Sequence, residues 1–129
     1  MTLKAPAPVL VMIVNYRTPD LALAAARSVE AEVRALPGAH VVIVDNGSGD
    51  DSADRIVAGV ADGGMADWCT ALPVARNGGF AAGNNAALRW HRDQTGEWPA
   101  YAWLLNPDTV AEPGAMAALI DFLAEHPDA

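Results

Sequence analysis

The stretch of sequence that decides the fold is a short apolar run near the start of the chain, Val9-Leu10-Val11-Met12-Ile13-Val14. All six side chains are apolar and most are β-branched. An unbroken run of this kind is typical of a parallel strand that is buried on both faces of its sheet. A second run of the same kind, VVIV, occupies residues 41–44. We therefore expect two fully buried strands in a parallel sheet.

A helical pattern separates these two runs. The helix is expected to open with Thr18 as its N-cap and Pro19 at its first helical position. Pro37 and Gly38 are expected to stop it. Its apolar face repeats at close to helical spacing, through Leu21, Ala25, Val29, Val33 and Leu36. One continuous helix is therefore predicted between the first two strands.

The alternation of helix and strand patterns continues along the chain. A second helix is expected to start at residues 50–52 and to end at 62–64, with an apolar face of Ala53, Ile56, Val57 and Val60. Residues 68–74 are a weaker strand candidate, which Pro73 places at an edge of the sheet. A glycine-rich loop at 76–85 is then expected to lead into a helix through about Trp90, followed by a loop at 94–99 and a strand at 101–105. A last helix is expected from Glu112-Pro113, with one apolar face made of Met116, Leu119, Ile120 and Leu123. About four strands and four helices in strict alternation predict one α/β domain over residues 1–129, a mostly parallel sheet with alternating helices.

Composition excludes several classes of protein. The chain has 129 residues, of which 52% are hydrophobic and 19% charged, a balance that argues against intrinsic disorder. Its formal net charge is -8, so a nucleic-acid partner is not expected, because such proteins need a basic surface. A small nucleotide ligand is still compatible with this charge.

Cys69 is alone, which excludes an intramolecular disulfide and favours a reducing, cytoplasmic setting. The longest apolar run is far too short to span a membrane.

Polar residues follow each expected strand, at 15–16, 45–46, 77–85 and 106–108. In open α/β sheets, ligands bind outside the carboxyl ends of the strands. Four polar segments at four strand ends therefore predict one binding crevice.

Each polar segment also has a purely structural interpretation. Asp45 could accept hydrogen bonds from a nucleobase or ribose, or it could close a turn in which Gly47 has a positive φ. Asp108 could bind a divalent cation that bridges two phosphates, or it could accept hydrogen bonds within a local turn. The glycine-rich segment 77–85 could offer backbone amides to a ligand, or its small residues could serve close packing. It matches neither the Gly-x-Gly-x-x-Gly nor the Walker A pattern.

Four motifs in order carry a family resemblance: Val14-Asn15-Tyr16-Arg17, Val44-Asp45-Asn46-Gly47-Ser48, Asn77-Gly78-Gly79-Phe80-Ala81-Ala82-Gly83-Asn84-Asn85 and Leu104-Leu105-Asn106-Pro107-Asp108. In this order and spacing, the chain from about Val9 to its C-terminus resembles the family 2 glycosyltransferases of GT-A fold, in particular the rhamnosyltransferase-like branch. The resemblance implies a Rossmann-like, nucleotide-binding half of a GT-A domain.

The resemblance also implies roles for individual residues. By this similarity, Val14, Asn15 and Tyr16 line the base and ribose pocket, Asp45 hydrogen-bonds the base, and Asn77, Gly83 and Asn84 lie along the nucleotide and sugar. Asn106-Pro107-Asp108 stands at the position of the family's Asp-x-Asp motif. Asp108 then contacts the Mg²⁺ or Mn²⁺ ion on the diphosphate of a UDP- or dTDP-sugar donor. Asn106 replaces the first carboxylate, which removes one charge from the metal site.

The resemblance further implies that a general base and an acceptor-binding region lie C-terminal to the Asp-x-Asp motif, so the catalytic residue stays unknown. The expected function is therefore the donor-binding portion of an inverting glycosyltransferase, without the C-terminal acceptor-binding half. The alternative is a non-catalytic module that binds a nucleotide or nucleotide sugar. A response-regulator-like protein is disfavoured, because Asn15-Tyr16 stands where an acidic pair would be needed. The acceptor, a glycan or a lipid-linked molecule, stays unidentified. The inner face of the membrane is an expected place of action. Self-association is expected if an apolar edge of the sheet is exposed.

Overall fold

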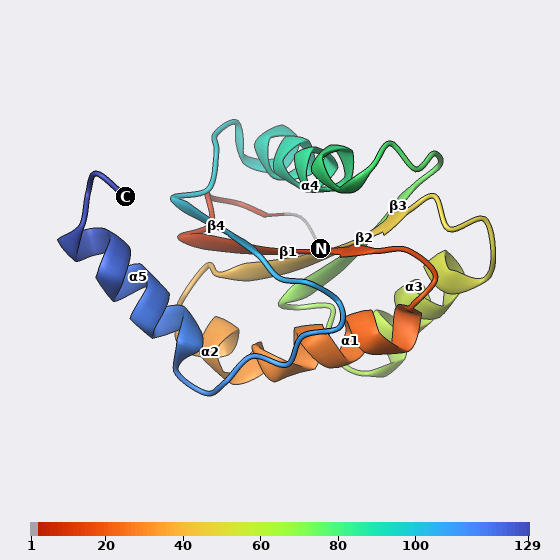
Figure 1. Cartoon of the computed structure of the whole chain (residues 1–129), viewed down its shortest axis with the longest axis horizontal. Helices are drawn as coiled ribbons and strands as arrows, with labels where there is room; N and C mark the ends of the chain where they lie inside the picture. The colour runs from red at the N-terminus through yellow and green to blue at the C-terminus, as the bar shows by residue number, and fades with distance from the viewer. Residues whose placement is uncertain (1–2) are drawn as a thin grey trace.

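The computed structural model describes residues 3–129 as a three-layer α/β/α arrangement (Figure 1). The elements in chain order are β1 (Val9–Asn15), α1 (Pro19–Ser28), α2 (Glu30–Ala35), β2 (His40–Asn46), α3 (Ser52–Asp62), β3 (Cys69–Val74), α4 (Phe80–Thr95), β4 (Tyr101–Leu104) and α5 (Ala115–Glu125). The strands form one sheet in the order β3-β2-β1-β4, and all three pairings are parallel. The α/β prediction is thereby confirmed, and β3 with its Pro73 lies at an edge as expected.

The two central strands are buried along their whole length, because helices cover both faces of the sheet. On one face, alternate strand residues such as Val11 and Ile43 pack against α1, α2 and α3. On the other face, Met12 and Val44 pack with Ala87 of α4. Figure 1 shows α4 on one side of the sheet and α1 and α3 on the other.

The helix predicted between β1 and β2 is instead two helices. The chain leaves helical geometry at Val29, which has φ −107° and ψ 2°, and α2 then starts at Glu30. Val29 is fully buried, so the break directs an apolar residue into the core without interrupting the apolar stripe. Leu21, placed on the buried face by its spacing, is 49% exposed, whereas Ala22, Ala25 and Ala26 form the contact with the sheet. Small side chains let α1 lie close to the strands.

Three further helix boundaries and the exposure of two residues differ from the predictions. The helix α4 starts at Phe80, inside the segment predicted as a loop, and extends to Thr95 rather than to Trp90. The last helix begins at Ala115, after a turn at Pro113 and Gly114 that the backbone N–H of Ala115 closes on the carbonyl of Glu112. Val57 and Leu119 are also about half exposed instead of buried.

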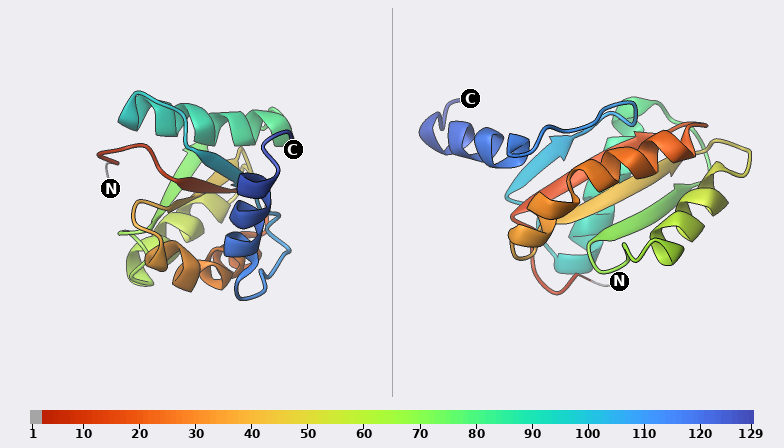
Figure 2. Two further views of the ribbon diagram at one scale, coloured as in Figure 1. Left: turned by 90° about the vertical axis from the view of Figure 1, so that its left-hand side faces the viewer. Right: turned by 90° about the horizontal axis from the view of Figure 1, so that it is seen from below.

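The last helix, α5, lies beside β4 and projects from one flank of the sheet (Figure 2). Met116 is its buried residue, and an apolar groove separates its inner face from Tyr101 and Trp103. Leu119 and Phe122 remain about half exposed. The described residues therefore carry an apolar surface on this flank.

Two buried histidines, His40 on β2 and His91 on α4, make polar contacts within the core. His40 stacks on Trp90 of α4 with ring centroids 5.7 Å apart, and its Nε2 lies 2.8 Å from the hydroxyl of Thr70 on β3. His91 accepts from the backbone N–H of Ala7 through Nε2, so its Nδ1 carries the proton and donates to the carbonyl of Glu97. Burial lowers the pKa of both imidazoles, that of His40 to about 4. Both rings are therefore neutral parts of the core at neutral pH.

His40 should make the protein lose stability as the pH falls. In the unfolded chain this residue takes up a proton below about pH 6.5, whereas in the folded protein it does so only near pH 4. The free energy of unfolding should thus fall by about 2 kcal/mol between pH 7.5 and pH 5 on account of this one group. Urea unfolding of the wild type and of His40→Gln at both pH values measures the effect. The wild type should lose more stability than His40→Gln, and the exposed-histidine control His126→Gln should follow the wild type; equal losses in all three would contradict the prediction.

Candidate functional site

A cluster of buried polar side chains lies at the carboxyl ends of β1 and β2. The parallel register sets Asn15 opposite Asp45, so both side chains leave the sheet on the same face. Asn15 Nδ2 donates to Asp45 Oδ1 at 3.0 Å. Asn15 is 0% and Asp45 5% exposed, and Ser48 beside them is 1% exposed. The two predicted residues are therefore brought together in a protected position.

Asp45 accepts hydrogen bonds from its own turn as well. The hydroxyl of Ser48 donates to Asp45 Oδ1 at 2.6 Å, and the backbone N–H of Ser48 donates to Oδ2 at 3.3 Å. Gly47 within this turn has φ +65°. The structural interpretation of the Asp45 turn is thus present in the fold. It leaves the carboxylate with unused acceptor capacity, since an ionised carboxylate has about four lone-pair positions.

Asn15 also organises the start of α1. Its Oδ1 accepts from both the backbone N–H and the hydroxyl of Thr18, at 3.1 Å and 3.0 Å. Thr18 therefore does not cap the helix with its side chain, contrary to the sequence-based expectation, although Pro19 does occupy the first helical turn. The Asn15 amide thus connects the β1–α1 loop to the β2–α3 loop.

The glycine-rich segment is tied to the end of β2 by Asn46. Its Nδ2 donates to the carbonyl of Gly79 at 2.9 Å and to Asn77 Oδ1 at 3.2 Å. Asn77 Oδ1 in turn accepts from the N–H of Gly79 at 2.8 Å. The backbones also touch, because a Cβ on Gly47 would lie 2.4 Å from the Asn77 nitrogen. Only a glycine at position 47 lets the two loops meet this closely.

Gly83 and Asn84 lie in the first turns of α4, on the side that faces the sheet. A Cβ on Gly83 would lie 2.7 Å from Val14 Cγ1, so this glycine allows the helix to pack on β1. Asn84 is 5% exposed, and its Nδ2 donates to the carbonyl of Phe80 at 3.2 Å. Within residues 3–129, the Oδ1 atoms of Asn46 and Asn84 are buried and accept no hydrogen bond. Buried acceptors without donors are uncommon in proteins. Ser52, Trp68 and Gln94 also carry such a buried atom, but the pair from Asn46 and Asn84 lies beside the glycine-rich segment.

The turn that follows β4 is more open than the rest of the cluster. Asn106 and Asp108 are exposed, Pro107 is partly buried, and the backbone N–H of Thr109 closes the turn on the carbonyl of Asn106 at 3.1 Å. No hydrogen bond between described residues joins this turn to the Asp45 cluster. Within residues 3–129 there is also no group of three His, Cys, Asp or Glu side chains placed to bind a metal ion. A cation at Asp108 would therefore take its other ligands from Asn106, from water and from a bound ligand.

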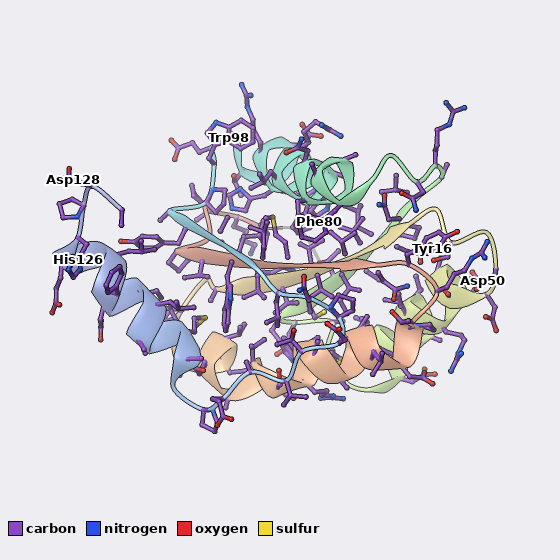
Figure 3. All side chains as sticks on the ribbon, in the orientation of Figure 1. Tyr16, Asp50, Phe80, Trp98, His126 and Asp128 are labelled. Carbon is purple, nitrogen blue, oxygen red and sulfur yellow. The ribbon has the colours of Figure 1, made fainter. Side chains whose placement is uncertain are left out.

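Two residues next to the cluster escaped the sequence analysis. Ser48 appeared only as the last residue of a quoted motif and was given no role, yet its hydroxyl links Asp45 to Arg17. Arg17 lies with its guanidinium carbon 4.9 Å from the ring centroid of Tyr16, which is 44% exposed. Figure 3 shows Tyr16 and Asp50 at the same end of the molecule. The Asp-x-x-Ser spacing is a signal for the Ser48 contact; the sequence holds no signal for the conformation of Arg17.

Comparison with known proteins identifies the family. A family model described as glycosyl transferase family 2 matches residues 10–129. The chain belongs to glycosyl transferase family 2. In this family member, the four polar segments that suggested the resemblance all lie within the matched region. A comparison with curated protein sequences finds no significant match.

A solved structure supports the same fold. A mannosyltransferase from Pyrobaculum calidifontis, in complex with GDP-Man and Mn²⁺, superposes with a TM-score of 0.64 at 21% sequence identity. The alignment covers 96% of this family 2 chain and 36% of the mannosyltransferase, so the chain spans about a third of that protein's length. The likeness establishes the GT-A fold. None of the helices in residues 3–129 combines the length and apolar character needed to cross a bilayer.

The contact between the two loops at Gly47 can be tested with a matched pair of substitutions. Gly47 and Gly49 both have positive φ, but nothing lies within 4 Å of a Cβ on Gly49. Gly49→Ala should therefore cost only the conformational penalty, about 1 to 2 kcal/mol. Gly47→Ala should cost a further 1 to 3 kcal/mol, roughly, because the new methyl group overlaps backbone atoms. Urea unfolding measures both; equal losses would contradict the close approach of the loops.

Proposed function

We propose that this chain is the donor-binding portion of an inverting glycosyltransferase that uses a nucleotide-diphosphate sugar. The observation that carries the proposal is the buried Asn15, Asp45 and Ser48 cluster at the carboxyl ends of two parallel strands, the place where open α/β sheets bind nucleotides. Membership of glycosyl transferase family 2 supports the reaction class. The work of this part of the enzyme is to bind and orient the donor.

The proposed roles of the side chains follow from their positions. Tyr16, half exposed above the cluster, offers an aromatic face to the base, and Asp45 offers acceptor capacity to base N–H groups. Val14, Asn77, Gly83, Asn84, Asn106 and Pro107 complete the proposed nucleotide-binding set. Of these, Val14 and Gly83 act through packing, since they contact each other.

A divalent cation, Mg²⁺ or Mn²⁺, fits the turn after β4 if the diphosphate is present. Asp108 supplies an exposed carboxylate and Asn106 an amide oxygen, the hard oxygen ligands that these ions prefer. When bound, the ion would neutralise charge on the leaving diphosphate. A site with one protein carboxylate needs phosphate oxygens to complete it, so nucleotide and cation should bind cooperatively. The Mn²⁺ and GDP-Man of the mannosyltransferase are consistent with a cation and a nucleotide sugar in this fold.

The donor base and the cellular setting are also proposals. UDP and dTDP sugars remain our proposed donors, with GDP added for comparison because the mannosyltransferase binds GDP-Man. We place the protein in the cytoplasm, at the inner face of the membrane, with a glycan or lipid-linked acceptor. A second candidate function is a module that binds a nucleotide sugar without transferring the sugar. Donor hydrolysis or sugar transfer by the purified chain would decide between them.

Thermal unfolding with UDP, dTDP and GDP, each with and without Mn²⁺, tests the proposed function. A ligand at about 100 times its dissociation constant adds about 2.7 kcal/mol of stability, which should raise the Tm by several degrees for a domain of this size. Asp108→Asn should keep the shift given by nucleotide alone and lose the increment due to Mn²⁺. The matched control is Asp121→Asn, which removes an exposed carboxylate on α5. An undiminished Mn²⁺ increment in Asp108→Asn would contradict the metal role, and no shift with any nucleotide would contradict the proposed function.

Base recognition by Asp45 predicts a change in selectivity. Asp45→Asn replaces an acceptor by a group that also donates, so the ratio of affinities among UDP, dTDP and GDP should change along with the overall affinity. Asp50→Asn, on an exposed neighbour in the same loop, should leave the ratio unaltered. Isothermal titration of the three nucleotides gives the ratios. The same ratio in Asp45→Asn and the wild type would count against a contact between Asp45 and the base.

A further inference from the structure

Arg17 has an unusual backbone conformation. Among the described residues it is the one non-glycine with a positive φ, at 59°. In this region the Cβ atom crowds the following carbonyl oxygen, so residues other than Gly, Asn and Asp are rare there. The strained residue lies in the β1–α1 loop, directly beside the proposed nucleotide site. Strain of this kind persists only where surrounding contacts enforce it.

Ser48 supplies the enforcing contacts. The backbone N–H of Arg17 donates to the Ser48 hydroxyl at 2.9 Å, and Arg17 Nε donates to the Ser48 carbonyl, also at 2.9 Å. The single hydroxyl proton of Ser48 is directed to Asp45 Oδ1 at 2.6 Å, which leaves the hydroxyl oxygen free to accept from Arg17. The buried carboxylate thus fixes the serine, and the serine fixes the backbone and side chain of Arg17.

The outcome of this chain of hydrogen bonds is the position of the guanidinium over Tyr16. Its carbon lies 4.9 Å from the ring centroid, within the range of a cation–π contact. One face of the ring is therefore covered by Arg17, and Tyr16 still has 44% of its surface exposed. A guanidinium tethered through Nε cannot move off the ring without losing the hydrogen bond to Ser48.

We propose that Arg17 is a positioning residue for the nucleobase: its guanidinium covers one face of the Tyr16 ring and holds the ring so that a flat heterocycle stacks on the other face. The inference rests on the proposed function, because it takes the ligand to be a nucleotide. Stacking on an aromatic ring is tolerant of base identity, since every base has a π-face. Arg17 therefore sets affinity for nucleobases in general, and the choice among bases belongs to other groups in the cluster.

Because the backbone of Arg17 is strained, a substitution there can weaken nucleotide binding without lowering the free energy of unfolding. Arg17→Gly places the residue best suited to positive φ at this position, which offsets the loss of the Nε hydrogen bond. The variant should therefore be about as stable as the wild type and yet bind nucleotides about ten-fold more weakly, as expected if most of the stacking contribution is lost. Arg17→Lys keeps the charge and the strain but cannot make the same hydrogen bond together with a stacked planar group. It should show the same loss of affinity, and it provides a second variant should the glycine alter the loop.

The experiment measures dissociation constants for UDP, for uridine and for inorganic pyrophosphate, together with urea unfolding without ligand. We expect Arg17→Gly to weaken UDP and uridine by the same factor and to leave pyrophosphate binding unchanged. Tyr16→Leu should weaken UDP similarly, and the double variant should be no weaker than Tyr16→Leu alone, because Arg17 acts through the ring. Additive losses in the double variant, or a loss confined to UDP and pyrophosphate, would overturn the proposal in favour of a phosphate contact.

The failure of this inference is distinguishable from failure of the proposed function. If the wild type binds none of UDP, dTDP, GDP and their nucleosides, the proposed function fails and the role of Arg17 fails with it. If the wild type binds UDP and both Arg17 variants bind it equally well, the proposed function stands and the positioning role is wrong. A loss of stability in Arg17→Gly with unchanged affinity would assign Arg17 a purely structural role.

Discussion

The register between β1 and β2 is the constraint on which the rest of the structure depends. Both strands are apolar on both faces, so burial of apolar side chains alone discriminates weakly between registers. Polar contacts at the strand ends provide the missing specificity. For β1 and β2 this contact is the hydrogen bond from Asn15 to Asp45 at their carboxyl ends. The contact of His40 with Thr70 does the same for β2 and β3 at the other end of the sheet. A slip of one residue would remove the Asn15 donor from the buried Asp45 carboxylate and leave the Asn15 amide without its acceptor, which costs more free energy than repacking apolar side chains.

The same register determines where two loops of the candidate site begin. Because Asn15 is bonded to Asp45, the β1–α1 loop and the β2–α3 loop leave the sheet side by side. Asn46, the next residue on β2, points to the opposite face and bonds the loop that precedes α4. Two adjacent residues of β2 thus organise the two faces of the site, one through Ser48 and Arg17 and the other through Asn77 and Gly79.

Sequence reasoning predicted the architecture because the strongest patterns lie in the strands. Apolar runs identified β1 and β2, and Pro73 identified an edge. The break between α1 and α2 at Val29 could not be predicted from the sequence. Val29 itself belongs to the apolar repeat, and the interruption depends on how the helix packs on the sheet. The start of α4 was missed for the opposite reason. Gly and Asn disfavour helices locally, but Gly83 is needed for close contact with Val14, and tertiary packing outweighs the propensity.

In the candidate site, Asp45 and Asn15 were predicted from the sequence. The positive φ of Arg17 arises from contacts with Ser48, 31 residues away, and is therefore not encoded in any local pattern.

The central position of β1 has a consequence for how the chain folds as it is synthesised. Leu10 pairs with His40 on one side and with Ala102 on the other, so this central strand is translated before either neighbour and completes its pairing only when β4 emerges. Until then, an apolar strand with one open edge stays in the nascent chain, a state in which non-local parallel sheets are prone to association. Until residues 101–104 have been made, the open edge of β1 is therefore a place where the nascent chain is exposed to association.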